Sequence, residues 1–160
     1  MPFLFKWIAR DENRFEMIVT ADLSGTGEIP RGGRIESING IAADRIYAQL
    51  MTIARADGAN DAKRRANIEL TGEGDREAFD IYFPLFFGAS DRFEIRLETP
   101  QQKVTAVSVA GMTAAERRAA IEMLAATRGL SSEESDEGAK EFGWRFEDVA
   151  EGVVRLKMPT

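Results

Sequence analysis

The most constraining feature of this sequence is a short strand that runs directly into a two-residue turn. Apolar and polar residues alternate over Arg34–Ile38, which predicts a β-strand with one buried face. Asn39 and Gly40 follow, and this pair favours the type I′ turn of a hairpin because both central residues need a positive φ. Gly32 and Gly33 precede the strand, where a sheet corner favours residues without a Cβ. A sheet that reverses direction at residues 39 and 40 is the first expectation.

Further strands are predicted on both sides of this turn. Phe3–Ile8 and Phe15–Ala21 are rich in aromatic and branched residues and are separated by a polar turn, which predicts a hairpin. Arg92–Thr99 alternates apolar with charged residues, and Val104–Val109 continues the β character. Together these segments predict a small, mostly antiparallel sheet.

The segment between the turn and the later strands is predicted to be helical. Apolar residues recur at steps of three and four over Asp44–Ala56, with Asp44 as the expected N-cap and Gly58 just past the end. Asn60 is the expected N-cap of a second helix over Asp61–Leu70. These helices make up an insertion into the sheet, at about residues 43–88.

A third helix of the insertion is expected to start at Asp75. It places four phenylalanines on one face, Phe79, Phe83, Phe86 and Phe87. Pro84 has no amide hydrogen, so the helix is predicted to kink or end near Phe83. The stripe can line an apolar pocket, although aromatic residues at helical spacing are more often packed in a core.

The remainder of the chain is predicted to hold a helix, a linker and a second hairpin. Thr113 and Glu116 form a capping box ahead of an apolar stripe, which comprises Met112, Ala119, Ala120, Met123 and Leu124. Ser131–Gly138 is acidic and polar, which predicts a mobile linker. Trp144–Phe146 and Val153–Met158 are then expected to pair around a turn at residues 151 and 152. The expected divisions are a sheet domain over residues 1–110, a helix and linker over 111–138, and a final segment over 139–160.

Composition limits the chemistry. The 160 residues contain no His and no Cys, so zinc, haem and iron–sulfur sites lose their usual ligands, as do His-based and Cys-based catalytic systems. We expect no cofactor and no metal. The net charge of −6 disfavours binding to nucleic acid or to an anionic membrane surface, and no apolar run reaches the roughly 18 residues that cross a bilayer. The fold class expected from these observations is α+β.

A family resemblance follows from these motifs. The stretch Ile29–Ile41 resembles the signature of PDZ domains, in which a Gly turn leads into an isoleucine-rich strand that ends in Asn-Gly. Asp57–Arg64, Phe86–Gly88 and Phe93–Leu97 follow in the order of the PDZ-like segment of bacterial tail-specific, or C-terminal processing, serine peptidases. Phe146–Pro159 is similar to the strand that opens the catalytic domain of that family.

The resemblance implies a substrate-recognition or gating segment of a serine-type peptidase, exported or periplasmic, whose partners are the rest of the peptidase and a polypeptide substrate or protein C-terminus. The family's Ser and Lys are not in this sequence, because no Ser is followed by a Lys one helical turn later. Ser24 also lacks the preceding Gly of a nucleophile elbow. No catalytic residue is therefore assigned. The alternative function is a stand-alone PDZ-like interaction module.

The expected mode of binding is addition of an extended peptide to a sheet edge. The first strand, with Phe3, Leu4 and Phe5, is predicted to face Ile46 and Leu50 of the first helix across the peptide groove. These five residues can equally be core residues. The carboxylates of Asp57, Asp61, Glu73 and Asp75 lack the alternate spacing of a calcium loop and are interpreted as turn and capping residues. Residues 25–27 lack the Lys-Ser or Lys-Thr pair of a phosphate loop.

Overall fold

The chain divides into two compact units, Met1–Ile121 and Glu122–Thr160. The computed structural model describes residues 1–11, 14–73, 77–127, 145–150 and 153–157. The expected helix start at Asp75, the linker Ser131–Gly138 and Trp144 lie outside these residues.

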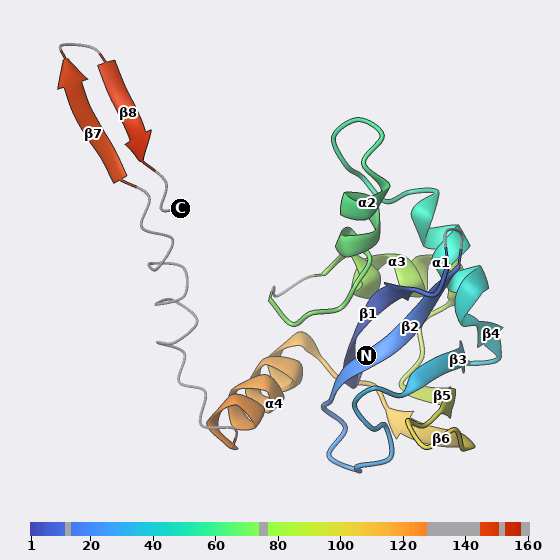
Figure 1. Cartoon of the computed structure of the whole chain (residues 1–160). Coiled ribbons are helices and arrows are strands. Elements are labelled where there is room, and N and C mark those ends of the chain that lie inside the picture. Colours follow the sequence, from blue (N-terminus) through green and yellow to red (C-terminus); the bar gives the residue numbers. More distant parts are fainter. Residues whose placement is uncertain (12–13, 74–76, 128–144, 151–152, 158–160) are drawn as a thin grey trace. The chain divides into compact units, whose positions relative to one another are not determined.

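The first unit contains an antiparallel sheet, which confirms the expected α+β class (Figure 1). Its strand order is β1-β2-β3-β5-β6, and the short β4 pairs with β3. All of the pairings are antiparallel. The strands are β1 (Phe3–Ala9), β2 (Phe15–Asp22), β3 (Arg34–Ile38), β4 (Ile41–Ala42), β5 (Arg92–Glu98) and β6 (Val104–Ala110).

Three helices lie between β4 and β5 in the chain, as the expected insertion requires. They are α1 (Ala43–Met51), α2 (Asp61–Asn67) and α3 (Ala78–Phe87), and α4 (Ala114–Thr127) follows β6. The three helices gather beside β1 and β2 (Figure 1).

The turn at residues 39 and 40 has the predicted conformation. Asn39 and Gly40 have φ values of 51° and 76°, and Ile38 pairs with Ile41 across them. Asn39 also fastens the turn to β5, because its N–H donates to the Glu94 carbonyl at 2.7 Å and its Oδ1 accepts from the Glu94 N–H at 2.9 Å. The turn therefore fixes where β3 meets β5.

The glycines ahead of β3 are required by the corner. Gly32 has a φ of 81°, and a Cβ on Gly33 would lie 2.9 Å from the carbonyl oxygen of Pro30. This close backbone approach is the reason that residues without a side chain precede the strand.

The predicted bounds of the first helix were wrong at both ends. Asp44 is not the N-cap: Ala42 is, because β4 leads straight into the helix, and the Asp44 carboxylate accepts from the neighbouring Arg45 N–H at 2.6 Å. The helix ends at Met51 and not at Ala56. The hydroxyl of Thr52 donates to the Gln49 carbonyl at 2.7 Å, which competes with continued helix formation.

The second and third helices also depart from prediction. Asn60 caps α2 as expected, since its Oδ1 accepts from the Lys63 N–H at 2.9 Å, but the helix ends at Asn67 because Leu70 pairs with β1. Pro84 was predicted to kink or end the third helix near Phe83, and the second of these is wrong, because α3 continues to Phe87.

The capping box of α4 is confirmed. The Thr113 N–H and hydroxyl donate to Glu116 Oε2 at 2.8 Å, and the Glu116 N–H donates to the Thr113 hydroxyl oxygen at 3.2 Å. These bonds lower the pKa of the Glu116 carboxyl. The predicted apolar stripe is not the buried part of this helix, because Met123 is exposed and Arg117 is the buried residue.

The core lies on one face of the sheet. Strands β1, β3 and β5 contribute Phe3, Phe5, Ile35, Ile38, Ile95 and Leu97, and helices α1 and α3 contribute Ile46, Leu50, Phe79 and Phe83. The opposite face is polar around Arg34, which pairs with Glu98 and, at 3.2 Å, with Glu36. Glu36 also accepts from Arg96 at 2.8 Å. One face is thus apolar and the other carries an ion-pair network.

The second unit contains the predicted closing hairpin. Strands β7 (Arg145–Ala150) and β8 (Val153–Lys157) pair antiparallel in a two-stranded sheet of their own.

The turn at residues 39 and 40 yields a stability test. Gly40→Val should lower the free energy of unfolding by about 1–2 kcal/mol or more, because a β-branched side chain is strained at positive φ. Asn39→Asp should cost less, because Asp tolerates this conformation and its carboxylate can still accept from Glu94. Urea unfolding of both variants measures the difference, and equal stability of the two would contradict the turn assignment.

Candidate functional site

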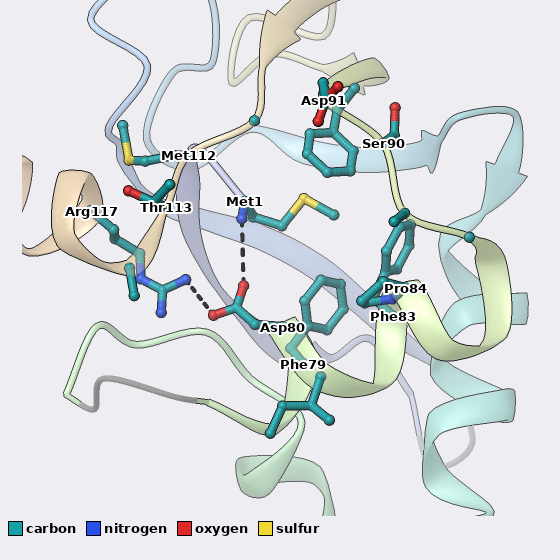
Figure 2. A pocket seen from close by; sticks show the side chains of 16 residues that line it. Met1, Phe79, Asp80, Phe83, Pro84, Ser90, Asp91, Met112, Thr113 and Arg117 are labelled. Carbon is teal, nitrogen blue, oxygen red and sulfur yellow. Dashed lines mark hydrogen bonds and ion pairs between the residues drawn. The ribbon is translucent and has the colours of Figure 1, made fainter.

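A cleft of about 590 Å³ opens on the first unit between α3, the loop over residues 88–91 and the start of α4 (Figure 2). Its volume falls within the range of ligand pockets. The apolar lining comprises Met1, Phe79, Phe83, Pro84, Phe93 and Met112. The stripe of helix α3 therefore contributes to both the core and a pocket wall.

Helix α3 is apolar on almost all sides, and its exposed face is unusual. Phe79 and Phe83 are buried, as expected, but Phe86 is 39% exposed, so the four phenylalanines do not share one buried face. Ile81 and Leu85, one turn apart, are 51% and 70% exposed. Because Ile81 also lines the cleft, the apolar surface extends from inside the cleft onto the outside of the helix.

Pro84 lies inside α3 and on the wall of the cleft. Having no N–H, it cannot donate the usual helical hydrogen bond to the carbonyl of Asp80. Both residues line the cleft.

A charged corner holds α4 against α3. Arg117 is only 3% exposed, and its Nη1 donates to Asp80 Oδ2 at 2.5 Å. The amino group of Met1 lies 3.5 Å from Asp80 Oδ1, so this carboxylate bridges two cations (Figure 2). Burial lowers the pKa of the Met1 amine, as does the charge of Arg117, although Asp80 opposes the shift.

Glu77 completes this corner from the other side of Arg117. Its Oε2 lies 3.7 Å from Arg117 Nη2, which is buried and makes no hydrogen bond among the residues described. The Glu77 carboxylate instead accepts from the N–H groups of Thr71 and Gly72, at 2.6 and 3.0 Å. Gly72 has a φ of 82°, and a Cβ there would lie 2.4 Å from Ile121 Cδ1, so a side chain at residue 72 would force the Ile121 side chain to shift.

The walls of the cleft are mainly apolar. Asp80 contacts both of its cations, the Met1 amine and Arg117, and Glu77 supplies a second negative charge close to Arg117. The hydroxyl of Ser90, another lining residue, donates to the Arg92 carbonyl and so has a structural role. Ser24 lies in a turn away from the cleft lining, where its hydroxyl donates to Asp22 Oδ1 at 2.6 Å.

The five residues predicted to face the peptide groove are all buried. Phe3, Phe5, Ile46 and Leu50 are fully buried and Leu4 is 8% exposed, so all five predicted residues lie in the core. A role for them in peptide binding remains a prediction.

The outer edge of β1 is also occupied. The Phe5 N–H donates to the Leu70 carbonyl at 2.9 Å, and the Leu70 N–H donates back at 3.3 Å. The Trp7 N–H donates to Glu69 Oε1 at 3.0 Å. Residues 69 and 70 thus cover the part of this edge where an added peptide strand was expected.

Within the described part of the chain, no group of three or more Asp, Glu, His or Cys side chains is arranged to hold a metal ion. None of its helices has the length and apolar character needed to cross a membrane.

The charged corner was missed at the sequence level. Arg117 stands between two other charged residues, Glu116 and Arg118, at the exposed start of a helix, which is typical of a solvated face. Asp80 is the one charged residue in α3, and an isolated carboxylate in an apolar helix was a usable signal that a cation lies opposite.

Comparison with protein-family models, with curated proteins and with solved structures found no match to this chain.

Removing the buried cation should destabilise the first unit. Arg117→Met leaves Glu77 and Asp80 without their common partner, and we expect a loss of about 3 kcal/mol, as for other broken buried pairs. Arg96→Met, which breaks an exposed pair with Glu36, should cost under about 1 kcal/mol. Urea unfolding measures both, and a double-mutant cycle with Asp80→Asn should show strong coupling. Equal effects of the two Arg variants would contradict the assigned role of the corner.

The covered edge of β1 predicts a dependence on pH. Burial raises the pKa of the Glu69 carboxyl, although the Trp7 N–H and two nearby cations oppose the shift. The contribution of Glu69 to stability is therefore complete below its unfolded pKa of about 4.3 and is lost as the pH rises through the folded value. Glu69→Gln should be more stable than the parent at neutral pH, and the difference should vanish below about pH 4. Urea midpoints across this range test the sign.

Proposed function

We propose that the first unit is a polypeptide-binding module whose site is the cleft beside α3. The observation that carries this proposal is the continuous apolar surface formed by the cleft wall and the exposed face of the helix, Ile81 and Leu85. Large exposed apolar patches on soluble domains mark interaction sites. Because the apolar surface extends outside the cleft, it suits a polypeptide, which can place several side chains along it, better than one small molecule.

The chemistry of the cleft favours an apolar anchor residue. Phe79, Phe83 and Phe93 offer aromatic surface, and such pockets receive the buried anchor of a protein partner. Polypeptide binding is common to both functions expected from the sequence, the peptidase segment and the interaction module.

A second, narrower function is the substrate-recognition or gating role in a serine-type peptidase, with the catalytic Ser and Lys outside this chain. It is supported by the resemblance of residues 29–41 and 146–159 to that family, and by the pairing of β7 and β8 in a sheet of their own. Isolated two-stranded hairpins are marginally stable in water, as expected for strands that open a further domain. A Ser and a Lys motif encoded after Thr160 would support this function, and their absence would contradict it.

Peptide selection tests the binding site. A displayed library of short random peptides, selected on the immobilised chain, should yield binders that contain apolar or aromatic residues. Ile81→Asp and Leu85→Asp place a carboxylate on the exposed apolar face and should weaken the selected peptides at least tenfold, which is about 1.4 kcal/mol. Fluorescence anisotropy with a labelled peptide gives the dissociation constants.

The matched control is Ile8→Asp, which changes an equally exposed isoleucine of β1 that is not among the cleft-lining residues. It should bind the peptides as the parent does. Failure to enrich any peptide, or equal binding by all three variants, would contradict the proposed site.

A further inference from the structure

Strand β6 forms the second edge of the sheet (Figure 1), and no strand among the described residues pairs with its outer side. Opposed residues of an antiparallel ladder alternate between hydrogen-bonded and non-hydrogen-bonded pairs. Thr99 and Lys103 are a hydrogen-bonded pair, because the Thr99 N–H donates to the Lys103 carbonyl. Backbone groups alternate in direction along an antiparallel strand, so those of residues 105, 107 and 109 point toward β5. The N–H and C=O groups of Val104, Ala106, Ser108 and Ala110 therefore point away from the sheet.

The contacts of Ser108 agree with this parity. Its carbonyl accepts from Arg92 Nη2 at 3.2 Å. This donor is a side chain and not a backbone group of β5, as expected for a carbonyl that points away from β5. Within the described parts of the chain, β6 pairs with β5 and with no other strand. The other edge of the sheet differs, because residues 69 and 70 cover β1.

The composition of β6 is that of an inner strand. Charged residues make up 30% of the chain, yet the seven residues of β6 include none, nor any Pro. Its register with β5 runs without a bulge, and Val104 is 45% exposed. Open edges usually carry charges, Pro or bulges that prevent pairing with another strand. An edge without these features is suited to receive one.

We propose that the strand added to β6 is β6 of a second copy of this chain, antiparallel, with Val107 on the two-fold axis. This register overlaps the whole strand. It sets Val104 opposite the partner's Ala110 and Ala106 opposite the partner's Ser108, so that the outward backbone groups of both copies meet. Each such pair exchanges two hydrogen bonds. The Arg92 side chain leaves the Ser108 carbonyl, which then accepts from the partner's Ala106.

The charges on β5 are arranged for this symmetry. Its outward side chains alternate in sign, in the order Arg92, Glu94, Arg96 and Glu98. Ile95 pairs with Val107, so a two-fold axis at Val107 exchanges Arg with Glu at every one of these positions. A row of side chains that crosses the joined sheets therefore has Arg92 at one end and the partner's Glu98 at the other, or Glu94 and the partner's Arg96. An unrelated peptide would gain nothing from this pattern.

The core-side face of the sheet is complementary as well. In this register Lys103 lies opposite the partner's Gly111. Within each chain the Gly111 N–H donates to the Asp91 carbonyl at 2.6 Å, so the partner's Asp91 lies beside the partner's Gly111, in the same row as Lys103. Gly111 has no side chain to stand between the ammonium and the carboxylate. Pairing of this kind closes at two copies, because each chain has one open edge in its described sheet.

Replacement of Ala106 by Pro tests the inference directly. The Ala106 N–H points outward, so Pro removes a hydrogen bond to the second copy and none within the sheet, a position where edge strands tolerate Pro. Ala106→Ser keeps the N–H and is the control. In sedimentation equilibrium the apparent mass of the parent and of the Ser variant should rise with protein concentration toward twice 17.7 kDa. The apparent mass of Ala106→Pro should remain that of one chain.

A charge exchange provides a second test on exposed side chains, which holds even if Ala106→Pro fails to fold. Glu94→Arg sets like charges at the ends of two rows, and the double variant Glu94→Arg/Arg96→Glu restores opposite ones. At an ionic strength near 0.01 M, where the Debye length is about 30 Å, the single variant should weaken dimerisation about threefold or more, and the double variant should recover it.

Three results would overturn the inference: a parent chain that stays monomeric, an Ala106→Pro variant that dimerises like the parent, or assemblies larger than two. A monomeric parent whose selected peptides lose binding on Ala106→Pro would show that the edge takes another polypeptide. Asp91 and Gly111 line the cleft as well, but Ile81 and Leu85, on which the peptide test depends, lie outside the paired strands, so these results leave the proposed function untouched.

Discussion

Phe5 joins the sheet to the helical insertion through both its backbone and its ring. Its amide and carbonyl exchange hydrogen bonds with Leu70, at the end of the segment that carries α2. Its ring packs against Phe79 of α3 at a centroid distance of 4.7 Å and against Trp7 at 5.6 Å. The insertion is therefore held on the sheet at this point by both directional and apolar contacts. Because Phe79 also forms a wall of the cleft, the position of the site follows from the contacts of Phe5.

The elements whose residues interact locally could be predicted from sequence. The turn at Asn39 and Gly40, the Asn60 cap and the capping box of Thr113 each depend on side chains within three residues of the backbone that they stabilise. The alternation of β5 predicted its buried face for the same reason. What failed depends on distant residues: α2 stops early because Leu70 pairs with Phe5, which is 65 positions away in sequence. The salt bridge of Arg117 with Asp80 has the same character.

The two edges of the sheet are treated in different ways, and this shapes the surface of the first unit. At β1 residues 69 and 70 cover the edge. The carboxylate of Glu69, which accepts from the Trp7 N–H, is partly buried there, and this burial raises its pKa. At β6 no described strand pairs with the outer backbone groups, and the Arg92 side chain donates to the Ser108 carbonyl there. The sequence predicted an added strand at β1, where Phe3 and Phe5 face the first helix, with core packing as the alternative. The burial of these residues agrees with core packing.

Substitutions at Gly72 and at Ile121, which lie close together, are expected to have different consequences for the fold. Two separate requirements meet at this residue: a backbone with φ of 82° and the close approach of Ile121. A smaller side chain at position 121 would relieve the contact but not the backbone strain, so no single change elsewhere can compensate a substitution at 72. A side chain at residue 72 therefore conflicts with both requirements, whereas a change at residue 121 alters only the contact. The loop that binds the Glu77 carboxylate is thus constrained by a residue that carries no side chain.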